Sequence, residues 1–567
     1  MEKQANFSPM QRFFKLLQPD KKEIRNVYAY AVFNGLVSLS LPLGIQAIVN
    51  LIQGGQISTS WIVLVVFVVL GVAITGVLQI FQLRITENLQ QRIFTRSAFE
   101  FAYRIPRIRL EVLYRHYAPE LMNRFFDTVS VQKGLSKILI DFSAASLQVI
   151  FGLILLSFYH PFFILFSLVL ILLVLAIFRF TAKKGLSTSL DESVIKYEVA
   201  HWLEELARAS NTFKLAGFSS LPLNRMNKTL SGYLNARDAH FKVLVQQYSL
   251  LIVFKVVVAT GLLAIGGILV MEQLMNIGQF IAAEIIILLV MNSVEKLILS
   301  LETIYDVLTA LAKIGQVTDL EIENTEGMNI AEKGRSEGLS VEFQDVDFIY
   351  PGSHYKTLEN ASFQLRAGER ILVTGQNNSG KSSLLRLLAG LYSAESGSIT
   401  YDGLSKGNIA IDSLRSIIGD SLSQELIFDG TVAENISVGR PQATIDNVRW
   451  AAKSMGVDSY ISTLPKGYDT QLDPLGKGLP GSIIKKILLA RSIADKPRLL
   501  LIENDLEQIN EIERKKIIDF LTSKENPWTL VVVSSDTFMI NAVDRVLNIE
   551  NGQIATIDPT SNTQNHA

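Results

Sequence analysis

Residues 370–390 read RILVTGQNNSGKSSLLRLLAG and contain the pattern G-x-x-x-x-G-K-S. An apolar run precedes the pattern and leucines at helical spacing follow it, so it lies between an expected strand and an expected helix. Two glycines let the backbone curl so that successive N–H groups point at phosphate oxygens, a lysine adds positive charge, and a serine hydroxyl can coordinate Mg²⁺. We therefore predict a site for a nucleoside triphosphate with Mg²⁺, formed by Gly375, Asn378, Ser379, Gly380, Lys381, Ser382 and Ser383.

The composition predicts that part of the chain lies in a membrane. Its 567 residues are too many for one ordinary core, 49% of them are hydrophobic, and the mean hydropathy is +0.28. The apolar excess falls before about residue 300, in runs close to the ~20 residues that a helix needs to cross a bilayer. The predicted spans are 27–52, 61–82, 138–158, 162–180, 249–271 and 279–299.

The charge distribution predicts the orientation and the environment. Lys and Arg are frequent in residues 1–26, 83–137 and 181–248, whereas 53–60 has no charge, so both termini and both long segments are expected in the cytoplasm. Membrane lipid is the expected surroundings of the spans. The net charge of −1 indicates no nucleic-acid partner, and the absence of Cys excludes disulfides and Cys-based metal sites.

The pattern along the chain predicts the fold class and the domains. The long polar segments are periodic, which favours helices that extend from the spans into the cytoplasm and turn at 117–121 and 211–217. From Leu339 onward, buried β-rich runs alternate with helical patterns, as in an α/β domain with a largely parallel sheet. We predict a membrane α-helical six-span bundle with long cytoplasmic helical extensions, plus an α/β P-loop nucleotide-binding domain. The expected boundaries are 1–26 for a cytoplasmic N-terminal segment, 27–320 for the transmembrane domain, 321–338 for a linker, 339–558 for the ATP-binding domain and 559–567 for a polar tail.

This organisation resembles a half-transporter of the ABC exporter family over nearly the whole chain. Shorter motifs agree in order and spacing: DFIYP at 347–351, GTVAENI at 430–436, KGYDT at 466–470, LARS at 489–492 and ENGQI at 550–554. The resemblance implies that Tyr350 stacks on adenine. It also implies a dimer with a second half-transporter, identical or different, and makes a periplasmic adaptor protein a further candidate partner.

The positions that act on the γ-phosphate depart from the family pattern. In the family, an Asp after the second core strand holds Mg²⁺ through water, and the next residue, Glu, activates the attacking water. Here the sequence 499–505 is LLLIEND, so Glu503 takes the metal position and Asn504 takes the position of the base. An amide cannot accept a proton as a general base, although it can still hydrogen-bond a water.

The other loops that contact the nucleotide in the family are also altered. The switch His is replaced by Ser535, and the metal-contacting loop Gln falls on Ser423, with Gln424 beside it. In place of L-S-G-G-Q, the signature loop consists of Leu479, Pro480, Gly481, Ser482 and Ile483. Because Pro480 has neither a hydroxyl nor an N–H, this loop is a poor phosphate clamp. The set indicates a domain that binds ATP but hydrolyses it slowly or not at all; the alternative is an ordinary ATPase in which neighbouring residues fill these roles.

Two charged residues fall inside predicted spans. Lys255 lies within the fifth span and Glu284 within the sixth. An isolated charge in hydrocarbon is costly, so such residues are either paired with each other or line a water-filled pathway. The sequence leaves open a structural Lys255–Glu284 pair and a substrate-cavity lining.

The primary hypothesis is an exporter half-transporter of the bacterial inner membrane, with the nucleotide-binding domain in the cytoplasm. It would move a peptide, protein, lipid or drug out of the cytoplasm as a dimer. The alternative is a non-transporting pseudo-ATPase that acts as an ATP-gated regulator or scaffold.

Overall fold

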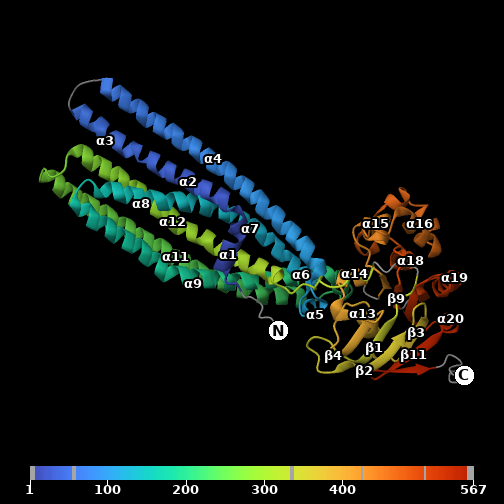
Figure 1. The fold of residues 1–567 in the computed structure, drawn as a ribbon. Helices are drawn as coiled ribbons and strands as arrows, with labels where there is room; N and C mark the ends of the chain where they lie inside the picture. The colour runs from blue at the N-terminus through green and yellow to red at the C-terminus, as the bar shows by residue number, and fades with distance from the viewer. Residues whose placement is uncertain (1–6, 54–58, 332–336, 423–425, 504–505, 558–567) are drawn as a thin grey trace. The chain divides into compact units, whose positions relative to one another are not determined.

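The computed structural model describes residues 7–53, 59–331, 337–422, 426–503 and 506–557. These residues form two compact units (Figure 1). The helical unit comprises Met1–Pro106 and Tyr117–Leu320, and the sheet unit comprises Arg107–His116 and Glu321–Ala567. The short segment 107–116 therefore belongs to the sheet unit, although both of its chain neighbours belong to the helical unit.

Within the described residues, the helical unit has six helical segments long and apolar enough to cross a membrane. They are Pro9–Gln53, Thr59–Arg107, Ala118–Ser157, Pro161–Arg208, Leu221–Met271 and Ile277–Thr318, and they run alongside one another as a bundle in Figure 1. Each contains one predicted span, in the predicted order, and the excess length of several of them forms the predicted helical extensions. The predicted six-span bundle is confirmed.

Several of these segments consist of more than one helix. The first is made of α1 (Pro9–Leu17), α2 (Lys21–Ser38) and α3 (Ser40–Gln53). The third is made of α6 (Ala118–Asn123), α7 (Asp127–Lys137), a π-helical turn (Ile138–Phe142) and α8 (Ser143–Ser157). The remaining long helices are α4 (Thr59–Arg104), α9 (Pro161–Arg208), α11 (Leu221–Met271) and α12 (Ile277–Thr318).

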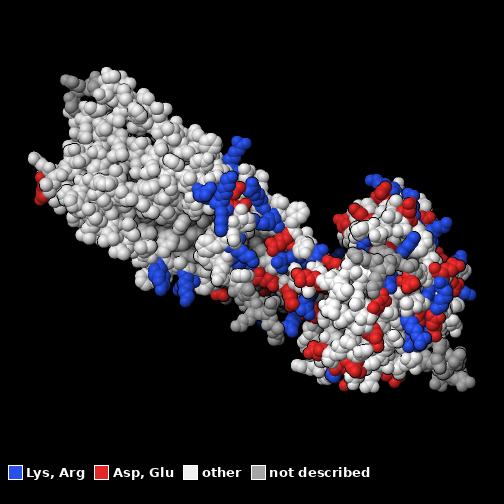
Figure 2. Space-filling model, viewed as in Figure 1, with Lys and Arg blue, Asp and Glu red and all other residues white. Residues whose placement is uncertain are grey.

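The surface of the helical unit is apolar where lipid would surround it. α12 packs against α3, α7, α8, α9 and α11 and is the most buried of the long helices, whereas α4 carries large exposed side chains such as Phe67, which is 68% exposed. In Figure 2 the bundle shows a long zone with few charged side chains, and Lys and Arg gather beyond one end of it. Apolar surface of this extent is stable in hydrocarbon and unfavourable in water.

The first predicted helix break is displaced. Residues 118–123 are helical in α6, so the turn predicted at 117–121 is wrong. The chain leaves the helix earlier, through the 3-10 turn Ile105–Arg107, where Pro106 lacks the N–H that a continuing helix needs, and then forms α5 (Leu110–Leu113). The second break lies close to the predicted range 211–217 but is not a simple turn: residues 211–215 are helical in α10 (Ser210–Leu215), and residues 216–220 separate α10 from α11.

The Lys255–Glu284 pair is also wrong. Lys255 Nζ lies 2.8 Å from Glu295 Oε2. α11 and α12 are consecutive helices that pack together, and Lys255 and Glu295 lie at similar distances from the turn that joins them. Glu284 lies about 16 Å from Glu295 toward the start of α12, since an α-helix rises 1.5 Å per residue.

Lys255→Met is expected to lower the apparent Tm of the protein in detergent by about 2–4 °C, because it leaves the Glu295 carboxylate without its partner. Lys255→Met/Glu295→Met should recover most of that loss. Glu284→Gln is the matched control, with little expected effect. Equal Tm values for the single and double variants would show that the pair does not contribute.

The sheet unit contains a largely parallel six-stranded sheet with the order β12-β11-β3-β10-β9-β6. Its strands are β3 (Arg370–Gly375), β6 (Ile418–Ser421), β9 (Leu499–Glu503), β10 (Thr529–Val533), β11 (Arg545–Glu550) and β12 (Gln553–Ile557). The pairing is parallel except between β11 and β12. The predicted α/β domain is confirmed.

An antiparallel sheet with the order β2-β1-β4-β5 accompanies the parallel one. It consists of β1 (Val341–Ile349), β2 (Lys356–Leu365), β4 (Ser396–Tyr401) and β5 (Leu404–Ser405). Neighbouring residues of β3 enter different apolar clusters, Leu372 in one and Ile371 and Val373 in the other. Side chains alternate along a strand, so β3 is buried on both faces and its C-terminal end is held rigidly.

Candidate functional site

The loop between β3 and helix α13 (Lys381–Leu388) curls as the sequence pattern predicts. Gly375 and Gly380 have φ of 143° and 110°, and Asn378 has φ of 64°. A Cβ at position 375 would lie 2.3 Å from the Ile549 carbonyl oxygen, and a Cβ at position 380 would lie 2.8 Å from the carbonyl oxygen of Thr357. Both glycines are therefore required by conformation and by space.

Polar groups of the loop are arranged around the start of α13. Lys381 Nζ donates to the carbonyl oxygens of Gly375 at 2.8 Å and Gln376 at 2.6 Å. Ser379 is buried, and its Oγ has no hydrogen-bond partner among the described residues. Buried polar groups are normally satisfied, so an unpartnered hydroxyl in this loop fits a site that is completed by a ligand with acceptor oxygens.

A carboxylate lies at the neighbouring strand end. Glu503 is buried at the C-terminal end of β9, opposite Val533 of β10. Burial lowers the pKa of Lys381, and the negative charge of Glu503 opposes that shift. Lys381, the Ser382 hydroxyl at the N-terminus of α13 and Glu503 thus form a donor set that fits a triphosphate with Mg²⁺.

The Tyr350 ring is held by other parts of the sheet unit. Its hydroxyl lies 2.9 Å from Ser383 Oγ and accepts a hydrogen bond from Arg386 Nη1 at 3.0 Å. The Tyr114 ring stacks on it, with 5.6 Å between the ring centroids and 24° between the planes. The hydroxyl of Ser383, a predicted nucleotide-binding residue, is therefore hydrogen-bonded to Tyr350. Tyr114, which the sequence analysis missed, lies next to the residue predicted to stack on adenine.

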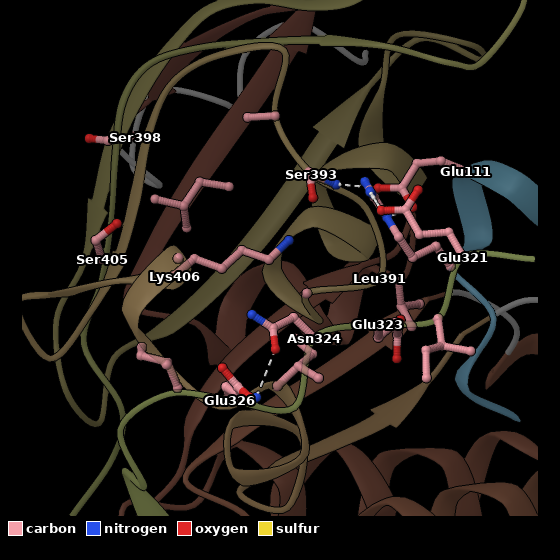
Figure 3. A pocket seen from close by; sticks show the side chains of 18 of the residues that line it. Glu111, Glu321, Glu323, Asn324, Glu326, Leu391, Ser393, Ser398, Ser405 and Lys406 are labelled. Atoms are coloured by element: carbon pink, nitrogen blue, oxygen red, sulfur yellow. Dashed lines mark hydrogen bonds and ion pairs between the residues drawn. The ribbon is translucent and has the colours of Figure 1, made fainter. Parts of the chain in front are cut away.

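Segment 107–116, which carries Tyr114, is bound to the rest of the sheet unit by polar contacts. Arg109 Nη1 pairs with Glu321 Oε1 at 2.8 Å, and Glu111 Oε1 accepts from the backbone N–H of Ser393 at 3.0 Å. These residues line a cavity of about 500 Å³, in which Lys406 extends toward the interior from the side opposite Glu111 (Figure 3). Burial lowers the pKa of Lys406 to about 8, with the Glu111 charge opposing the shift.

The signature loop lies at the start of another helix. Pro480 and Gly481 are exposed at the N-terminus of α18 (Gly481–Ile493), Ser482 is half-buried, and Ile483 is buried in an apolar cluster against which Leu479 packs. α18 packs against α15 (Val432–Ser437), α16 (Ile445–Ser454) and β6, whereas α13 packs against β2, β3, β9 and β10. Within the described part of the sheet unit, these contacts place the signature loop and the phosphate loop on separate helices with different neighbours.

Several predicted residues are not placed at the site. Asn504, Ser423 and Gln424 lie outside the described residues. β10 ends at Val533, which lies opposite Glu503, and Ser535 is the second residue after that strand end. Their predicted roles stay predictions.

Comparison with known proteins identifies the class. The family model described as ABC transporter transmembrane region matches residues 27–294, and the model described as ABC transporter matches residues 358–504. A solved structure of a bacterial Atm1-family ABC exporter with ATP bound superposes with a TM-score of 0.82 and 18% identity, covering 94% of each chain. The chain belongs to the ABC transporters and has the half-transporter architecture of an exporter.

Curated relatives match parts of the chain. An uncharacterized ABC transporter ATP-binding protein of Bacillus subtilis, YfiB, is 33% identical over 43% of this chain and 41% of its own length. A multidrug efflux ATP-binding/permease protein of Mycobacterium bovis is 32% identical over 39% of this chain and 18% of its own length. The cyclolysin secretion/processing protein CyaB of Bordetella pertussis is 27% identical over 58% of this chain and 46% of its own length. The alignments thus span about half or less of each relative.

Tyr114→Ala is expected to tighten binding of a fluorescent ATP analogue about threefold, because the Tyr114 ring covers a face of Tyr350 on which the predicted adenine stack would form. In a Tyr350→Ala background the same change should have no effect. The measurement is an equilibrium fluorescence titration, with the exposed Tyr355→Ala as the control. Unchanged affinity in Tyr114→Ala would show that the two rings do not compete with the base.

Proposed function

We propose that this protein is an ATP-binding exporter half-transporter that works as a dimer in the bacterial inner membrane, with weak or absent intrinsic hydrolysis. The observation that carries the proposal is a fully formed phosphate loop, with Lys381 folded across it and the Ser379 hydroxyl unpartnered, next to a strand end that reads Glu503-Asn504. The binding groups are present, and the base is replaced.

The residues of the chain divide into binding and hydrolytic functions. The loop from Gly375 to Gly380 and Lys381 would hold the phosphates, and Ser382 with Glu503 would hold Mg²⁺. Bound ATP with Mg²⁺ would supply the contacts that bring two nucleotide-binding domains together. Asn504 can hydrogen-bond a water but cannot remove its proton, so turnover is slow even when the nucleotide is bound.

The dimer would not rescue hydrolysis by itself. In the family the signature loop of one subunit meets the phosphate loop of the other, and here that loop presents Pro480 and Gly481 at the surface. Pro480 contributes neither the hydroxyl nor the N–H of the usual Ser. The exposed proline also favours the second candidate function, an ATP-gated regulator or scaffold for another membrane protein.

The substrate class is open among peptide, protein, lipid and drug. The printed names of the relatives point to multidrug efflux and to secretion, which are activities of those proteins. A second half-transporter, identical or different, is the first partner to seek, and a periplasmic adaptor is a further candidate.

The test compares nucleotide binding and phosphate release by the purified chain in lipid, with Lys381→Ala as the blank. We expect Mg-ATP binding that Lys381→Ala abolishes, and phosphate release by the wild type at the level of the blank. Asn504→Glu/Pro480→Ser should release phosphate at least about tenfold faster, because it restores a base and a phosphate-binding hydroxyl. Wild-type release far above the blank would show a working ATPase and overturn the claim of weak hydrolysis.

Absence of binding in the wild type would overturn the proposed function itself. Asn504→Gln/Pro480→Ala is the matched control for the restoring pair, since it changes both positions without adding a base or a hydroxyl.

A further inference from the structure

The helical unit has an open cavity of about 550 Å³, lined by both polar and apolar side chains, between α2, α4, α8, α12 and the π-helical turn Ile138–Phe142. Its polar lining includes Asn34, Ser38, Thr75, Gln82, Asp141 and Lys296. These residues belong to the halves of four predicted spans that the charge distribution places toward the cytoplasm. The cavity therefore lies at the depth where lipid headgroups meet hydrocarbon.

Two buried side chains of the lining have oxygens without a partner. Gln82 is 0% exposed; its Nε2 donates to the Val27 carbonyl oxygen at 3.2 Å, and its Oε1 has no hydrogen-bond partner among the described residues. The orientation of this amide follows from Val27, since a carbonyl only accepts. Asn34 is 8% exposed, and its Oδ1 is also without a partner in the described part of the chain. Buried polar atoms are rarely left unsatisfied, so a ligand that donates hydrogen bonds to these two oxygens would fit the cavity.

Two opposite charges line the same cavity. Asp141 lies in the π-helical turn, a type of helix irregularity that is frequent at functional sites, and this turn packs against α2, α4, α8 and α12. Lys296 lies on α12. Within the described ranges neither has an ion-pair partner within 4 Å, in contrast to Lys255 and Glu295, which neutralise each other.

The surroundings suit an amphipathic ligand. Ile80 and Leu83, which also line the cavity, are 64% and 62% exposed on the outer surface of α4. Gly35, Gly76 and Ala144 contribute little side-chain volume to the lining. A polar head can therefore occupy the cavity while an acyl chain lies along the exposed apolar surface beside it.

We propose that this cavity binds the zwitterionic head of an amphipathic molecule, with a protonated amine held by Gln82, Asn34 and Asp141 and an anionic group held by Lys296. An ammonium donates several hydrogen bonds, and its positive charge pairs with the Asp141 carboxylate. A phosphate or carboxylate supplies the negative charge that pairs with the Lys296 ammonium. This assignment rests on the proposed function in that the cavity would be the intake site of the exporter. The same chemistry occurs in an aminophospholipid and in a small soluble zwitterion.

The test uses the full chain in phosphatidylcholine nanodiscs that contain a trace of photoreactive phosphatidylethanolamine, without nucleotide. We expect crosslinks to residues lining the cavity and competition by unlabelled phosphatidylethanolamine. The bulk phosphatidylcholine has no N–H donor and should occupy the cavity about tenfold more weakly, so replacing part of it by unlabelled phosphatidylethanolamine should remove most of the labelling. Unchanged labelling after that replacement, or crosslinks confined to other helices, would overturn the proposal.

Variants separate the two charges. Asp141→Asn and Gln82→Met should each reduce phosphatidylethanolamine labelling about tenfold while leaving labelling by photoreactive phosphatidylglycerol unchanged, whereas Lys296→Gln should reduce both. Asp191→Asn and Lys183→Gln, exposed residues of α9 that do not line the cavity, are the matched controls. Thermal unfolding of each variant identifies any that misfold, and Asp141→Asn is the deciding variant if Gln82→Met does. Wild-type labelling in Asp141→Asn would overturn the assignment.

Soluble glycerophosphoethanolamine distinguishes the sources. Competition equal to that of the lipid would support the zwitterion site and assign it to a soluble ligand, and weak competition would support it and assign it to a lipid. Because nucleotide is absent throughout, failure of ATP binding or hydrolysis does not affect this result, and loss of lipid labelling does not affect the nucleotide test.

Discussion

Hydrocarbon offers the backbone no hydrogen-bond partners, and this constraint shapes the protein. Every N–H and C=O in the bilayer must be paired within the chain, so each span is helical, and four of the spans lie in helices of 42 to 51 residues, α4, α9, α11 and α12. A long helix has only a few places where the chain can leave it. Pro106 provides one, and segment 107–116 departs there to join the sheet unit.

The features that could be predicted from the sequence are those that depend on neighbouring residues. The spans follow from local hydropathy, and the phosphate loop follows from two glycines whose Cβ positions would collide with the carbonyl oxygens of Ile549 and Thr357. The partner of Lys255 could not be read in this way, because it depends on the register of α11 against α12. The Tyr114–Tyr350 stack and the cavity at Gln82 join segments far apart in the chain, and no local pattern marks such contacts.

Nucleotide binding and nucleotide hydrolysis depend on different atoms. Binding depends largely on backbone N–H groups and Lys381, which a rigid strand end and the start of α13 hold in place. Under the proposed function, hydrolysis would depend on a base at the position of Asn504 and on a phosphate clamp at the position of Pro480. Substitution at the two hydrolytic positions leaves the phosphate-binding groups intact, so loss of ATP turnover would not require loss of affinity for ATP.

Segment 107–116 belongs to the sheet unit and is covalently continuous with helices on both sides. Its ends continue into α4 and α6, while Tyr114 stacks on Tyr350, the residue predicted to meet adenine. Its contacts through Arg109 and Glu111 are charged and partly exposed. The segment has further contacts: Ile108 is 4% exposed and bridges Ile322, Leu110 packs against an apolar cluster of the sheet unit, and backbone hydrogen bonds join Arg107 and Arg109 to Glu323 and Glu321. Exposed ion pairs contribute little free energy, so apolar burial and backbone hydrogen bonds hold the segment more than its charged contacts do, and the ring stack is one contact among several.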